Sequence, residues 1–306
     1  MKNRIKKVPI PLSAVMLGSA ALGNLLEGYS EGIRHMCAVV AVICLVLLLL
    51  KLMIAPQAVK ADMKNPIMAS VSATFPMSLM LLSTYAAPMV GRAAIYLWYF
   101  AILLQVTLFS YFTLTFVIKL QVPRVFGSYF IVYAGIAMIA ATAPVYGKRA
   151  LGNVAFWVAF PCVLVMMVIV TYRYITIPKV LEAEKPLICI YTAPLSLCTV
   201  GYLQSVTPKS HLFVLILYST ITMLYLFALV KAIGYLRLPF HPSCASFTFP
   251  FVVSATASKQ MMDYLAGMGR SLPVLHYIAL IETVIAVVFV VYTVIRFCKF
   301  LVNSSL

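Results

Sequence analysis

The sequence predicts an all-α integral membrane protein with ten transmembrane helices. These helices are expected to form five helical hairpins in a quasi-fivefold ring, with the odd-numbered helices lining a central pore. Of the 306 residues, 64% are hydrophobic and only 10% are charged, and the mean hydropathy is +1.05. Soluble domains are about 45–50% apolar and about 25% charged. The composition therefore excludes an ordinary water-soluble domain and makes the lipid bilayer the expected surroundings of the chain.

Ten stretches are long and apolar enough for membrane-spanning helices, each of which needs about 20 residues. They cover residues 8–26, 33–54, 66–87, 92–118, 126–144, 150–172, 186–205, 210–236, 243–265 and 273–301. The linkers are short, so residues 1–306 are expected to form a single transmembrane domain. The basic start of the chain also resembles a secretory signal peptide. We favour a first transmembrane helix, because removing it would break the repeat described below.

The distribution of charge predicts the orientation. If both termini are cytoplasmic, 16 Lys and Arg residues lie on the inner face and seven on the outer face, as the positive-inside rule requires. With the acidic residues included, the inner face carries +13 and the outer face +4. We therefore expect a multi-pass protein of the cell (plasma) membrane, whose two faces both attract small anions. The basic residues form short runs between apolar stretches, so nucleic acid is not an expected partner.

A repeat of helix pairs underlies the predicted ring. The odd-numbered helices begin near residues 8, 66, 126, 186 and 243, at intervals of 57 to 60 residues, which indicates five copies of one hairpin. Gly, Ala, Ser and Thr fill 38 of 95 positions in windows of the odd helices but 18 of 95 in the even ones. Small residues allow close helix–helix contact or line a cavity. Five odd helices inside five even helices is the simplest arrangement, and a solid ten-helix bundle is the alternative.

Prolines distinguish four of the odd-numbered helices. Pro11, Pro76, Pro194 and Pro250 lie within predicted odd spans. An interior proline removes a backbone hydrogen bond and kinks its helix. The freed carbonyl groups are tolerated where protein or a water-filled cavity can satisfy them, so these prolines favour a path lined by the odd helices.

A short signature occurs in two of these helices. The third contains Thr74-Phe75-Pro76 and the ninth contains Ser246 followed by Thr248-Phe249-Pro250. Hydroxyl and apolar groups bind an anion weakly and so favour its passage, whereas an aromatic ring in the path would block it. The residues of this signature and Pro194 are the predicted pore-lining residues. Packing in the core is the alternative for each of them.

No catalytic chemistry is predicted. The sequence contains no Ser-His-Asp pattern, metal-ligating cluster or glycine-rich phosphate loop, so neither enzyme activity nor a cofactor or metal is expected. Ionisable residues within spans are functional candidates by default. Lys259 and Glu282 are interpreted as a candidate intramembrane charge pair, and two separate groups are the alternative.

Ten spans in five hairpins, proline-bearing odd helices and the segment Thr248-Phe249-Pro250 resemble the TDT family of tellurite-resistance/dicarboxylate transporters. The bacterial TehA members of that family are homologues of the plant slow anion channels. The resemblance extends over essentially the whole chain. It implies a homotrimer with a separate pore in each subunit and a phenylalanine in the ninth helix that closes the pore. The matching residue is Phe249, and Phe75 is a weaker second candidate.

The expected function is transport of small inorganic anions or C4-dicarboxylates through this pore. A proton-coupled secondary carrier that exports C4-dicarboxylate, sulfite or tellurite is the alternative, and a receptor or scaffold without transport is a third reading. Carriers often contain two inverted repeats, whereas the hairpins here repeat in one orientation, which favours a static pore.

Overall fold

Helices make up all the regular structure in the part of the chain that the computed structural model describes, residues 5–270 and 272–303. The longer helices are α2 (Leu12–Leu26), α3 (Glu31–Ile54), α6 (Thr74–Val90), α7 (Ala94–Phe112), α8 (Tyr129–Thr142), α9 (Arg149–Thr176), α10 (Ala193–Ser205), α11 (His211–Tyr235), α12 (Phe249–Ala266) and α13 (Pro273–Asn303). Shorter elements are α4 (Pro56–Asp62), α5 (Pro66–Ser72) and the 3-10 helices η5 (Glu182–Thr192) and η6 (Pro242–Phe247). Each of the ten predicted ranges therefore contains a helix.

Seven helical stretches among these described residues are long and apolar enough to cross a membrane. They are Glu31–Ile54, Pro66–Val117, Tyr129–Tyr146, Arg149–Thr176, Glu182–Ser205, His211–Tyr235 and Pro273–Asn303. The stretch Pro66–Val117 holds 52 residues and covers two of the predicted ranges. The helix α2 is apolar but has only 15 residues. These helices are those of a multi-pass membrane protein.

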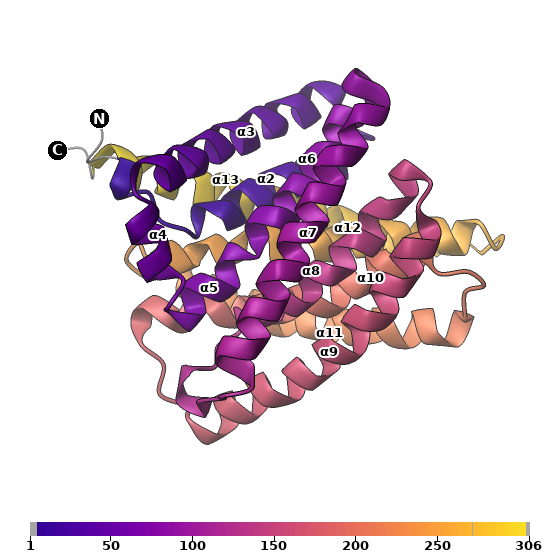
Figure 1. Cartoon of the computed structure of the whole chain (residues 1–306). Coiled ribbons are helices and arrows are strands. Elements are labelled where there is room, and N and C mark those ends of the chain that lie inside the picture. Colours follow the sequence, from indigo (N-terminus) through magenta and orange to yellow (C-terminus); the bar gives the residue numbers. More distant parts are fainter. Residues whose placement is uncertain (1–4, 271, 304–306) are drawn as a thin grey trace.

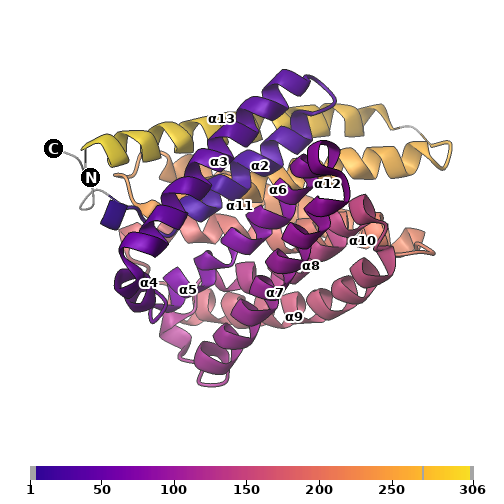
Figure 2. The same cartoon turned by 45° about the horizontal axis from the view of Figure 1, so that its top comes forward.

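Five helices form the inside of the bundle. The helix α2 packs against α6, α6 against α8, α8 against α10, α10 against α12, and α12 returns to α2. Each of these helices also contacts the long helix that follows it in the chain. In Figure 1 and Figure 2, α4 and the last turns of α13 lie at one end of the bundle, and the connection between α12 and α13 lies at the other.

Burial differs sharply between the two kinds of helix. In α2, 14 of 15 residues are buried, whereas only three of 24 are buried in α3. Large apolar side chains of the outer helices α3, α9 and α11 are exposed instead, among them Met53, Val168 and Val230 at 78%, 71% and 71%. Apolar surface of this extent is stable in contact with lipid or another subunit rather than with water.

Hydroxyl groups join successive hairpins along the inside of the bundle. Ser13 and Thr74 share a hydrogen bond of 2.7 Å, and Ser70 donates to Ser128 at 2.8 Å. Thr192 and Ser254 share another, at 2.6 Å. These partners are 61, 58 and 62 residues apart in sequence, which is close to the length of one hairpin repeat. Small polar residues in buried helices can therefore hydrogen-bond across helix–helix contacts as well as line a cavity.

Candidate functional site

A cavity of about 250 Å³ lies among the five inner helices. Every one of the five contributes to its wall, together with the segments that lead into α6, α10 and α12. The wall includes Pro11, Ala14, Asn65, Val71, Thr74, Met77, Phe130, Ala134, Glu184, Leu187, Ala193, Pro194, His241, Ser246, Phe249 and Pro250. In each inner helix these residues belong to the half nearer the N-terminus, so the cavity occupies one half of the bundle.

Three inner helices begin inside the bundle, beside this cavity. The helix α6 starts at Thr74 after α5, α10 starts at Ala193 after η5, and α12 starts at Phe249 after η6. The first turn of an α-helix carries unpaired N–H groups and a partial positive charge of about half a unit. Each of these starts follows another helical segment, however, and the N–H groups of Ala193 and Thr248 already bond to the carbonyl oxygens of Ile190 and Ala245. No Lys or Arg is among the residues that line the cavity.

The predicted prolines lie at or near the starts of the inner α-helices. Pro194 and Pro250 are the second residues of α10 and α12, Pro76 is the third residue of α6, and Pro11 is the N-cap of α2. A proline in the first turn lacks only an N–H group that would have no helical partner anyway. Pro76 and Pro194 also lie inside the longer helical stretches Pro66–Val117 and Glu182–Ser205, where each removes one backbone hydrogen bond. Within the described residues, interior prolines occur in α6, α9 and η5, at Pro88, Pro161 and Pro186.

Phe249 lines the cavity. It is the first residue of α12, and 6% of its surface is exposed. Thr248 fixes the start of this helix, because its hydroxyl Oγ1 contacts the carbonyl oxygens of Ala14 at 3.0 Å and Ala245 at 2.7 Å. The ring of Phe249 is thus attached to a backbone that is anchored on α2.

The predicted site residues separate into two groups. Thr74, Pro194, Ser246, Phe249 and Pro250 line the cavity. Phe75, Pro76 and Thr248 are not among its lining residues. Ser246 also donates a hydrogen bond of 2.6 Å to the carbonyl oxygen of Pro186, so its hydroxyl joins two neighbouring hairpins.

Lys259 and Glu282 have different partners in the described structure. The ammonium group of Lys259 donates to the carbonyl oxygen of Leu25 at 3.3 Å and lies 5.5 Å from the centre of the Tyr29 ring. The carboxylate of Glu282 accepts a hydrogen bond of 2.6 Å from Ser258, and Glu282 is 4% exposed. No ion pair joins Lys259 to Glu282 within 4.0 Å among the described residues.

Two ionisable residues of the cavity wall are absent from the sequence prediction. Glu184 and His241 line the cavity near the starts of η5 and η6. His241 lies 3.9 Å from the carboxylate of Glu182, measured from its Nε2 atom. Both residues fall in predicted linkers, so the apolar pattern carries no signal for them. Both lie just before a predicted inner span, 186–205 for Glu184 and 243–265 for His241, and this shared position is the sequence feature that could have identified them.

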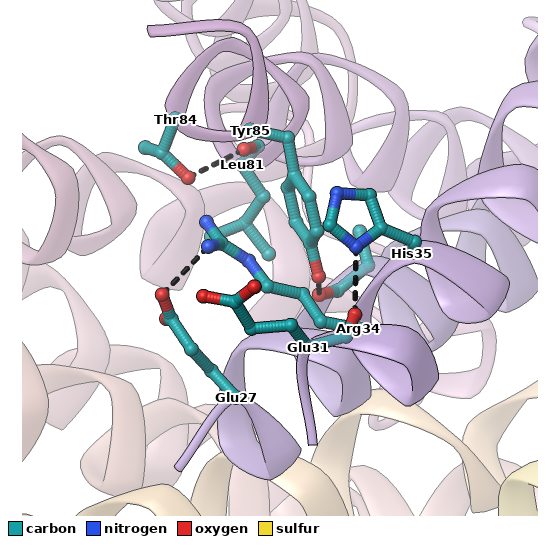
Figure 3. A network of polar contacts seen from close by, with 8 residues as sticks. Glu27, Glu31, Arg34, His35, Leu81, Thr84 and Tyr85 are labelled. Carbon is teal, nitrogen blue, oxygen red and sulfur yellow. Dashed lines mark hydrogen bonds and ion pairs between the residues drawn. The ribbon is translucent and has the colours of Figure 1, made fainter. Parts of the chain in front are cut away.

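A polar network holds the opposite end of α2 (Figure 3). The Arg34 Nη1 atom donates to Glu27 Oε1 at 2.6 Å, and the Arg34 guanidinium lies 4.7 Å from the centre of the Tyr85 ring. The Tyr85 hydroxyl donates to the carbonyl oxygen of Ala20 at 2.7 Å. Side chains from α3 and α6 therefore fix the C-terminal part of α2, while Thr248 fixes its beginning.

Comparison with known proteins agrees with this architecture. The family model described as SLAC1, voltage-dependent anion channel, matches residues 7–298, which includes all the inner helices. No curated protein sequence matches the chain. The chain therefore belongs to the SLAC1 family of voltage-dependent anion channels, the family that includes the TehA-like homologues of plant slow anion channels.

Proposed function

We propose that the chain conducts small anions along the axis of its five inner helices, and that Phe249 closes this path. The observation that carries the proposal is the cavity itself, because all five inner helices and Phe249 line it. Membership of an anion channel family supports the same conclusion. In this proposal all ten predicted spans cross the plasma membrane, with both termini in the cytoplasm.

The chemistry of the cavity suits an anion in transit. Most of its wall is apolar, Thr74 and Ser246 contribute hydroxyl groups, and no Lys or Arg lines it. Weak binding of this kind allows an ion to enter and to leave again. Net charges of +13 and +4 on the two faces raise the local anion concentration at both ends of the path.

A proton-coupled carrier is the alternative mechanism. Such a carrier needs an ionisable group that the substrate or its path can reach. The buried carboxylate of Glu282 lies against Ser258 between α12 and α13 and is not among the residues that line the cavity. This position excludes Glu282 as the coupling group, so a carrier would have to use Glu184 or His241, which do line the cavity.

The assembly proposed is a homotrimer with one path in each subunit. The exposed apolar surfaces of α3, α9 and α11 offer enough area for contact both with lipid and with neighbouring subunits. Native mass measurement of the detergent-solubilised protein tests this state. Three chains per particle is the expected result, and a monomer would contradict it.

Substitution of Phe249 tests the proposed gate. In planar bilayers containing the purified protein, Phe249→Leu and Phe249→Ala are expected to raise chloride current several-fold, with the larger increase for Ala. Phe247→Leu is the matched control. Phe247 lies two residues earlier, is 1% exposed and packs against Phe289, with ring centres 6.0 Å apart, outside the cavity wall. Equal currents for wild type and both Phe249 variants, with intact assemblies, would remove Phe249 from this role.

The same recordings separate a channel from a carrier. A channel gives a current that reverses at the potential set by the anion gradient, whatever the proton gradient. A reversal potential that shifts with the proton gradient at a fixed anion gradient would favour the carrier.

A further inference from the structure

A hollow of about 410 Å³ lies at the end of the bundle that carries α4 and the last turns of α13 (Figure 1). Its wall consists of Arg296, Lys299, Phe300 and Asn303 of α13, together with Phe240 from the segment between α11 and η6. Counted from Arg296, the other three α13 residues follow after three, four and seven positions, which places all four on one face of the helix. The hollow shares no lining residue with the cavity among the inner helices.

The guanidinium group of Arg296 is held in a fixed position in this wall. Its Nη1 and Nη2 atoms donate to the carbonyl oxygen of Leu238 at 3.0 and 3.1 Å, and the group lies 5.8 Å from the centre of the Phe240 ring. The Tyr292 hydroxyl donates to the carbonyl oxygen of Leu236 at 2.6 Å, which attaches the preceding turn of α13 to the end of α11. A carbonyl group carries no net charge, so these bonds orient the guanidinium group without neutralising it.

No carboxylate balances the positive charge of the hollow. Neither Arg296 nor Lys299 has an Asp or Glu side chain within 4.0 Å among the described residues. The sequence explains this, because residues 185–262 and 283–306 contain no Asp or Glu. Arg237, which is exposed just after α11, adds a further positive charge at the same end of the bundle.

The length of α13 brings the hollow to the level of lipid headgroups. This helix has 31 residues, or about 46 Å at about 1.5 Å per residue, whereas the hydrocarbon core of a bilayer is about 30 Å thick. The last turns of α13 therefore extend into the headgroup layer when the helix spans the membrane. Exposed apolar side chains lie within a few turns of the hollow, among them Ile233 of α11 and Ile295 of α13, and these suit contact with acyl chains.

We propose that this hollow binds the headgroup of an anionic phospholipid. Guanidinium and ammonium groups form charge-assisted hydrogen bonds with phosphate oxygens, which assigns the phosphate to Arg296 and Lys299. The amide of Asn303 is a further donor in the same wall. The positive-inside rule requires basic residues on one side of the membrane, but it requires neither their convergence on one hollow nor a guanidinium group fixed by backbone carbonyls. The site lies outside the proposed anion path and does not depend on it.

Native mass spectrometry of the detergent-solubilised protein tests the site. The fraction of protein that carries phosphatidylglycerol is measured against lipid concentration, with phosphatidylcholine, whose headgroup has no net charge, as the comparison lipid. Phosphatidylglycerol is expected to bind more tightly. One basic residue near an anionic lipid headgroup changes the affinity about fivefold, so Lys299→Gln is expected to weaken phosphatidylglycerol binding by this factor. The Lys299 side chain is exposed, so the substitution removes charge without disturbing packed residues.

Arg237→Gln is the matched control for charge at the same end of the bundle. Arg237 is exposed and does not line the hollow. Salt screens a charge of this kind, so phosphatidylglycerol binding is expected to stay within about twofold of wild type.

Four results would overturn the assignment. The first is equal phosphatidylglycerol binding by wild type and Lys299→Gln. The second is an equal loss in Arg237→Gln, because the attraction would then belong to the whole face. The third is equal affinity for the two lipids, which would mean that apolar contact alone holds them. The fourth is displacement of the lipid by inorganic phosphate at the same concentration, which would make free phosphate the ligand. None of these measurements involves anion current, so the proposed channel function is tested separately.

Discussion

The side chain of Thr248 fills the space beside Gly18 that a β-carbon would need. A β-carbon on Gly18 would come within 2.4 Å of Thr248 Cβ and 2.6 Å of Thr248 Oγ1. Contacts this short do not exist in folded proteins, so only glycine lets α2 approach the start of α12. The position of Phe249, the next residue, depends on this contact.

Gly18→Ala is therefore expected to destabilise the protein. Overpacking of a close contact costs about 1–3 kcal/mol, and urea or thermal denaturation in detergent measures that loss. Gly234→Ala in α11 is the matched control, because nothing lies within 4 Å of a β-carbon built there. This control should be neutral or slightly stabilising, since Ala favours helix over Gly by up to about 1 kcal/mol. Equal stability of both variants would show that α12 moves away without cost.

The network around Arg34 predicts unequal effects for its two charged members. The side chain of Arg34 is 18% exposed, whereas that of Glu27 is 51% exposed. An ion pair with one exposed partner contributes about 0–1 kcal/mol, so Glu27→Gln should reduce the free energy of unfolding by less than about 1 kcal/mol. Arg34→Ala also removes the packing on Tyr85, where a cation–π contact is worth about 0.5–2 kcal/mol.

Thermal denaturation in detergent compares the two variants. Arg34→Ala should lower the melting temperature more than Glu27→Gln does. Arg34→Lys should recover only part of the loss, because an ammonium group cannot stack on the ring as a planar guanidinium does. Full recovery with Lys would show that charge alone matters at this position.

A double-mutant cycle distinguishes the partners of Glu282. Ser258→Ala and Glu282→Leu each remove the hydrogen bond of 2.6 Å between these side chains, and a hydrogen bond to a charged group is worth about 1.5–3 kcal/mol. The coupling energy between Ser258 and Glu282 should therefore reach about 1 kcal/mol or more. Residues that share no contact usually add within about 0.5 kcal/mol, and this is the value expected between Lys259 and Glu282. If the coupling energy between Lys259 and Glu282 exceeded that between Ser258 and Glu282, the two charged side chains would form a direct ion pair after all.

The helix positions were predictable because they depend on a local property of the sequence, the length and apolar character of each run. An apolar run of sufficient length is helical in a membrane whatever its neighbours are, and so the ranges from 8–26 to 273–301 each contain a helix. Phe249 was predictable in a different way, through a short motif that resembles those of a known family. Its place in the cavity wall agrees with the expectation, while its role as a gate stays a prediction.

Other features depend on packing that no local pattern reveals. Whether a proline lies inside a helix or at its start depends on the preceding backbone: Thr248 is non-helical and makes Pro250 a first-turn residue, whereas Ala73 is helical and leaves Pro76 inside the stretch Pro66–Val117. The rise along a helix places Lys259 and Glu282 at similar depths. Only the rotation of each helix about its axis decides that Glu282 contacts Ser258 while Lys259 contacts the end of α2.

The hydroxyl contacts between hairpins also imply an order of assembly. The contacts from Ser13 to Thr74 and from Thr192 to Ser254 each link residues about one hairpin apart, whereas the contact from Thr248 to Ala14 links residues 234 positions apart. Contacts between neighbouring segments form early, while distant ones carry a larger entropic cost of loop closure. During synthesis, the contact between Thr248 and Ala14 can therefore form only after α12 has been inserted beside α2. Until then one side of the cavity stays open to lipid, and the wall that completes it is the one that carries Phe249.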